Sequence, residues 1–87
     1  MASAAEKLFE RMRLSKADWG ADDLHTLYVG FGFDCEQGSN HTLYIHPVWH
    51  DLRATVGRHS PLAIGYVTTA LKLVREVRAR EERKNAR

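Results

Sequence analysis

The stretch from Gly38 to Pro47 constrains the fold most strongly, because it predicts the turn and second strand of a β-hairpin. Residues 38–40 are the turn formers Gly, Ser and Asn, and residues 42–45 are mostly types that favour strands. Residues 33–37 alternate in character ahead of the turn and predict the first strand. Pro47 ends the second strand, predicted over 41–46, because proline cannot donate to the ladder.

The rest of the chain adds one strand and three helices to this hairpin. A capping box of Ser3 and Glu6 starts a helix predicted over 3–13. A second helix is expected to be capped by Asp22 or Asp23 and to stop in a left-handed turn at Gly30 and Gly32. A third strand is predicted over 52–57, and a last helix opens at Ser60 or Pro61 with an apolar stripe of Ile64, Val67, Ala70, Leu71, Val74 and Val77. The sequence therefore predicts an α+β fold of order α-α-β-β-β-α, with a three-stranded antiparallel sheet and helices packed on one face.

Length and composition narrow the class of protein. The 87 residues suit a single domain with a modest core. The single cysteine, Cys35, excludes an internal disulfide and suits a reducing compartment. No apolar run approaches the roughly 20 residues of a membrane span, and the N-terminal residues lack a signal-peptide core. We expect a cytoplasmic protein with no membrane partner.

Charge is concentrated near the end of the sequence. Residues 72–87 hold seven basic and three acidic side chains, a local charge of +4, whereas the whole chain carries only +2. Such a run is either an electrostatic footprint for RNA or a solvated helix with internal ion pairs such as Glu76–Arg80. The sequence leaves both open.

His41 is the first residue of the predicted second strand. Alternation places His41 on one face of the sheet with Leu43 and Ile45, and Tyr44 on the other face. An exposed imidazole at a strand end can exchange a proton near neutral pH, as a general base in RNA cleavage must. The alternative is a surface histidine with no function.

Several motifs in order resemble the HicA family of toxins, the small mRNA-cleaving ribonucleases of HicA–HicB toxin–antitoxin pairs. They are Gly30-Phe31-Gly32-Phe33, Gly38-Ser39-Asn40-His41, Tyr44, His46-Pro47, Thr55-Val56-Gly57-Arg58-His59, Leu62, Gly65 and Ala70-Leu71-Lys72. In many members the histidine follows Gly-Ser directly and a proline stands where this chain has Gly57. The likeness divides the chain into an N-terminal helical extension (1–18), a HicA-like core (19–75) and a basic C-terminal tail (76–87).

This resemblance implies a fold like a double-stranded-RNA-binding domain and cleavage of mRNA without a metal or other cofactor. His41 would be the catalytic residue, Arg58 and His59 would bind the phosphate, and Gly38 and Ser39 would set the turn geometry. Tyr44 would face the helices, and a HicB-like antitoxin would cover the opposite face of the sheet.

Other interpretations of the same residues stay open. The fold can serve a non-catalytic RNA-binding or protein-interaction module. His46 and His50 have an H-x₃-H spacing, and with His59 they could bind zinc, although no carboxylate or thiol ligand stands at a telling spacing. His25 lies off the apolar stripe of its helix and is expected to be a plain surface residue.

Overall fold

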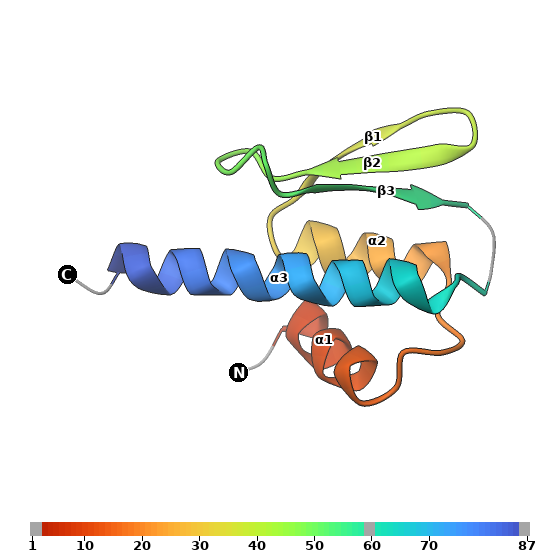
Figure 1. The fold of residues 1–87 in the computed structure, drawn as a ribbon, viewed down its shortest axis with the longest axis horizontal. Coiled ribbons are helices and arrows are strands. Elements are labelled where there is room, and N and C mark those ends of the chain that lie inside the picture. The colour runs from red at the N-terminus through yellow and green to blue at the C-terminus, as the bar shows by residue number, and fades with distance from the viewer. Residues whose placement is uncertain (1–2, 59–60, 86–87) are drawn as a thin grey trace.

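The computed structural model describes residues 3–58 and 61–85 and has the predicted α+β order (Figure 1). Its elements are α1 (Ala4–Leu14), α2 (Ala21–Gly30), β1 (Asp34–Gln37), β2 (His41–Ile45), β3 (Arg53–Gly57) and α3 (Ile64–Asn85). The sheet forms one layer, α2 and α3 lie side by side beneath it, and α1 lies on the far side of these two helices. One face of the sheet is therefore covered by helices, while the other is uncovered by any described element.

Helix α1 packs on α2 and supplies part of the core. The predicted capping box is present: Ser3 Oγ accepts the Glu6 backbone N–H, and Glu6 Oε1 accepts the Ser3 N–H. Phe9 and Met12 are buried in the same cluster as the side chains beneath the sheet. Burying a side chain of this size stabilises a fold by about 1.5–3 kcal/mol.

Helix α2 begins and ends differently from the sequence prediction. It starts at Ala21, so neither Asp22 nor Asp23 is its cap; instead Asp23 Oδ2 accepts the N–H of the capping residue Gly20 at 2.9 Å. Gly30 is still helical, and of these two glycines it is Gly32 that has a positive φ, of 91°. Glycine is favoured at such an angle because it has no Cβ to clash with the backbone.

The sheet is antiparallel in the order β1-β2-β3. The register aligns Cys35 with Tyr44 and Ala54, and Glu36 with Leu43 and Thr55. Directly paired residues share a face, so Tyr44 faces the helices and Leu43 faces away. The separation of Tyr44 from Leu43 agrees with the alternation read from the sequence, which left open the face that the helices cover. Phe33 precedes β1, and His46 and Leu52 lie just outside β2 and β3.

Helix α3 starts later and continues further than the apolar stripe suggests. It begins at Ile64, not at Pro61, and Ile64 is exposed rather than part of the buried stripe. The buried side chains of α3 are Val67, Ala70, Leu71, Val74 and Val77. The helix runs on to Asn85, and the expected Glu76–Arg80 ion pair is present at 2.9 Å. No helix in the described residues has the length and apolar content that a bilayer span requires.

Candidate functional site

The hairpin turn is held by a short backbone contact. The Gly38 N–H donates to the His41 carbonyl at 2.8 Å, and a Cβ on Gly38 would lie 3.1 Å from that oxygen. A side chain would crowd the turn, so glycine suits this position. Ser39 is exposed within the turn. The contact fixes the backbone at the point where β2 begins.

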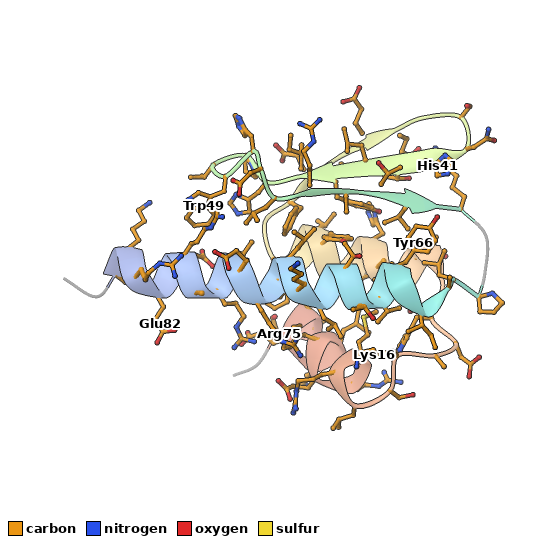
Figure 2. The ribbon with its side chains drawn as sticks, in the orientation of Figure 1. Lys16, His41, Trp49, Tyr66, Arg75 and Glu82 are labelled. Carbon is orange, nitrogen blue, oxygen red and sulfur yellow. The ribbon has the colours of Figure 1, made fainter. Side chains whose placement is uncertain are left out.

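His41 lies at the hairpin end of β2, on the uncovered face (Figure 2). Its side chain is exposed, and it shares this face with the half-buried Leu43 and Ile45. The residue paired with it on β3 is Gly57, which has no side chain to crowd the imidazole. The ring is therefore accessible from solvent at the end of the sheet.

Arg58 follows β3 directly and lies at the same end of the sheet. Its guanidinium donates to the carbonyl of Gly38, which joins the exit of β3 to the hairpin turn. Its side chain lines a pocket together with Thr42 and Tyr44, on the helix side of the sheet. The structure therefore brings Arg58 to the turn that precedes His41, but it places the two side chains on opposite sides of the sheet. His59, the other candidate phosphate ligand, lies outside the described residues.

The pocket that Arg58 lines has a volume of about 470 Å³. The first turns of α2 form one wall, and the hairpin ends of the strands form the other. Its polar lining consists of Asp22, His25, Gln37, Thr42, Tyr44 and Arg58. Ligand pockets in proteins usually measure about 300–1,000 Å³, so this pocket is large enough for a small molecule, and its lining is more polar than is usual for one.

His25 is part of this pocket, which corrects the expectation of a plain surface residue. Its Nδ1 shares a hydrogen bond of 2.8 Å with the hydroxyl of Tyr44, and the residue is half-buried. The Tyr44 ring is buried and stacked on Tyr28, with 4.6 Å between centroids. Burial raises the pKa of Tyr44 to about 12, so the hydroxyl is protonated at neutral pH. Position 25 lies three residues before buried Tyr28, and this helical spacing is the signal that could have placed His25 beside the core.

His46 serves the loop that joins β2 to β3. It is buried, and its Nδ1 accepts the backbone N–H groups of Val48 at 3.1 Å and Trp49 at 3.3 Å. Burial lowers the pKa of His46, which matches an imidazole that must stay unprotonated to accept these bonds. His50 Nε2 lies 2.9 Å from the Pro47 carbonyl oxygen. Within residues 3–58 and 61–85, no group of three or more His, Cys, Asp or Glu side chains is arranged to hold a metal ion.

Comparisons of this chain with protein-family models, with curated proteins and with solved structures found no match.

Proposed function

We propose that this protein is an endoribonuclease of the HicA type that cleaves mRNA with His41 as its acid–base residue. The observation that carries this proposal is the exposed imidazole at the first position of β2, on the face of the sheet that no described helix covers. The run from α2 through β1, β2 and β3 to α3 also has the α-β-β-β-α order of double-stranded-RNA-binding domains, which supports the resemblance.

In this reaction the imidazole of His41 takes the proton of a ribose 2′-hydroxyl. The 2′-oxygen then attacks the adjacent phosphorus, and the bond from phosphorus to the 5′-oxygen breaks. Water protonates the departing oxygen, which leaves a 2′,3′-cyclic phosphate and a 5′-hydroxyl. General base catalysis of this kind accelerates a reaction by about 10²–10⁴-fold. That Arg58 and His59 bind the phosphate stays a prediction: Arg58 lies on the opposite side of the sheet from His41, and His59 lies outside the described residues.

The uncovered face of the sheet supports a protein partner as inhibitor. Leu43 and Ile45 form its apolar centre, and the register places Asp34, Glu36 and Arg53 around them. A HicB-like antitoxin that covers this face would also cover His41, because His41 lies on the same face of β2 as Leu43 and Ile45.

A second candidate function is a non-catalytic interaction module on the same fold. The carboxylates of Asp34 and Glu36 favour it, because they lie on the same face as His41 and repel phosphate. This module would bind a protein partner and would leave RNA intact.

Expression of the wild-type chain and of two histidine variants separates the two functions. The wild type is expected to arrest growth and degrade mRNA, and His41→Ala is expected to abolish both while its circular dichroism spectrum stays unchanged. His50→Ala is the matched control, because His50 is also exposed but lies on the loop between β2 and β3. Purified wild type should cleave RNA equally well with EDTA. If the folded His41→Ala protein cleaves RNA like wild type, the module replaces the ribonuclease.

A further inference from the structure

The pocket beneath the hairpin end of the sheet holds two opposite charges that are not paired with each other. Asp22 and Arg58 line the same pocket, yet the structure describes no ion pair between them. The neighbouring carboxylate, Asp23, is engaged by the Gly20 N–H, whereas no hydrogen bond from a described residue reaches the Asp22 carboxylate. A ligand with hydrogen-bond donors on one edge and hydrogen-bond acceptors on another can therefore bind the Asp22 carboxylate and the Arg58 guanidinium at the same time.

The neutral groups of the pocket extend this pattern. Gln37 brings an amide that both donates and accepts, and Thr42 brings a hydroxyl. The hydrogen bond between His25 Nδ1 and the Tyr44 hydroxyl fixes the half-buried imidazole ring at the pocket wall. Aromatic side chains, histidine included, are the usual stacking partners of unpaired bases in RNA-binding proteins.

Guanine fits this arrangement of charges. Its Watson–Crick edge carries two adjacent N–H donors that a carboxylate can accept together, and its O6 and N7 are the acceptors that arginine binds most often. Each of the other bases offers only one donor group on this edge, the exocyclic amine of adenine or cytosine or the ring N3–H of uracil. The Asp22 carboxylate and the Arg58 guanidinium therefore favour guanine over adenine, cytosine and uracil.

The pocket and His41 lie at the same end of the sheet on opposite sides. Thr42 follows His41 directly in β2, and its side chain lines the pocket while His41 lies on the uncovered face. Arg58, bonded to the Gly38 carbonyl, lies at the edge between them. A single strand of RNA that passes over this edge can place a phosphate near His41 and a neighbouring base in the pocket.

We infer that this pocket binds one unpaired guanine of the RNA substrate and so gives the enzyme a base preference next to the cleaved bond. This inference rests on the proposed ribonuclease function, because that function supplies the RNA strand. Asp22 reads the Watson–Crick edge, Arg58 binds the acceptor edge, and the His25 ring stacks on the base.

Binding to the 87-residue His41→Ala chain tests the pocket without turnover. Four fluorescein-labelled RNA pentamers, UUGUU, UUAUU, UUCUU and UUUUU, are titrated and followed by fluorescence anisotropy. UUGUU should bind on the order of tenfold more tightly than the others, as one bidentate contact to a base provides. Asp22→Asn in the same background should lower the preference severalfold and leave only the part that Arg58 supplies through O6 and N7. The control Asp34→Asn, which removes a carboxylate from the uncovered face, should keep it.

Three outcomes would overturn the inference. They are equal binding of the four pentamers, a guanine preference that Asp22→Asn leaves undiminished, and binding of free GMP as tightly as UUGUU, which would make the ligand a nucleotide rather than RNA. The result is separable from the nuclease proposal. Cleavage of RNA through His41 without a preference for guanine would contradict only the proposed guanine pocket. Binding of UUGUU through Asp22 without any cleavage would contradict only the proposed nuclease.

Discussion

Asp51 and Arg80, 29 positions apart in the sequence, form a bidentate ion pair. Arg80 Nη1 donates to Asp51 Oδ1 at 3.0 Å, and Arg80 Nη2 donates to Asp51 Oδ2 at 2.8 Å. Asp51 lies in the loop between β2 and β3, and Arg80 lies in the part of α3 beyond the apolar stripe. The same guanidinium also bonds to Glu76 and lies 5.9 Å from the Trp49 ring centroid. Trp49 projects from the loop toward α3 (Figure 2). One arginine therefore links the last turns of α3 to the sheet.

Arg80→Ala should loosen both the end of α3 and the loop that carries Trp49. Backbone amides over residues 80–85 should exchange hydrogen for deuterium faster, and Trp49 fluorescence should shift toward longer wavelength as the ring becomes more exposed. Arg83→Ala is the control, because Arg83 makes only a 3.4 Å contact to Glu76. If amide exchange over 80–85 is the same in Arg80→Ala and wild type, the link to Asp51 does not order the helix end.

His46 should make the fold sensitive to acid. Burial lowers its pKa in the folded chain below the ordinary 6.5, so the unfolded chain binds the proton more tightly. Its contribution to stability is present above about pH 6.5 and is lost as the pH falls below that value. Urea unfolding at pH 5, 6, 7 and 8 measures this dependence.

In His46→Asn, the amide oxygen can still accept the N–H groups of Val48 and Trp49 but does not titrate. The fall in unfolding free energy between pH 7 and pH 5 should therefore be smaller in this variant than in wild type, whatever its absolute stability. Equal pH slopes in the two proteins would show that acid acts through other groups.

Two glycines should respond in opposite ways to substitution by alanine. A Cβ on Gly30 would lie 2.3 Å from the Ala5 Cβ, so Gly30→Ala must push α1 away from α2 and should cost about 1–3 kcal/mol. A Cβ on Gly65, in the first turn of α3, would meet no atom within 4 Å, and Gly65→Ala should stabilise the protein by up to about 1 kcal/mol. Chemical denaturation measures both. The double variant Ala5→Gly, Gly30→Ala should recover most of the loss, and a failure to recover would mean that the clash is not the cause.

Tyr28→Phe should raise stability. The Tyr28 ring is fully buried, and its hydroxyl has no hydrogen-bond partner among the described residues. Removal of an unsatisfied buried hydroxyl while the ring keeps its stack on Tyr44 should add about 1 kcal/mol to the unfolding free energy. The comparison is Tyr44→Phe, which removes the hydrogen bond to His25 and should cost about 1 kcal/mol. A lower melting temperature for Tyr28→Phe than for wild type would show that the hydroxyl is satisfied in solution.

Features that depend on local spacing could be predicted from the sequence. Two-residue alternation separated His41 from Tyr44 on the two faces of β2, and four-residue spacing gave the Glu76–Arg80 ion pair. Strand and helix geometry fix these relationships wherever the element forms. The boundaries of α2 and α3 were less accurate, because Gly20 and the residues after Pro61 adopt conformations that depend on their neighbours in the fold.

Contacts between residues far apart in the sequence could be identified only from the tertiary structure. The contacts of His25 with Tyr44, Arg58 with Gly38 and Arg80 with Asp51 join residues 19, 20 and 29 positions apart. No periodicity encodes such pairs, because they depend on how the sheet lies on α2 and α3. For the same reason the pocket could not be predicted from the sequence. The residues that line it come from α2, β1, β2 and the end of β3, and only the fold brings them together.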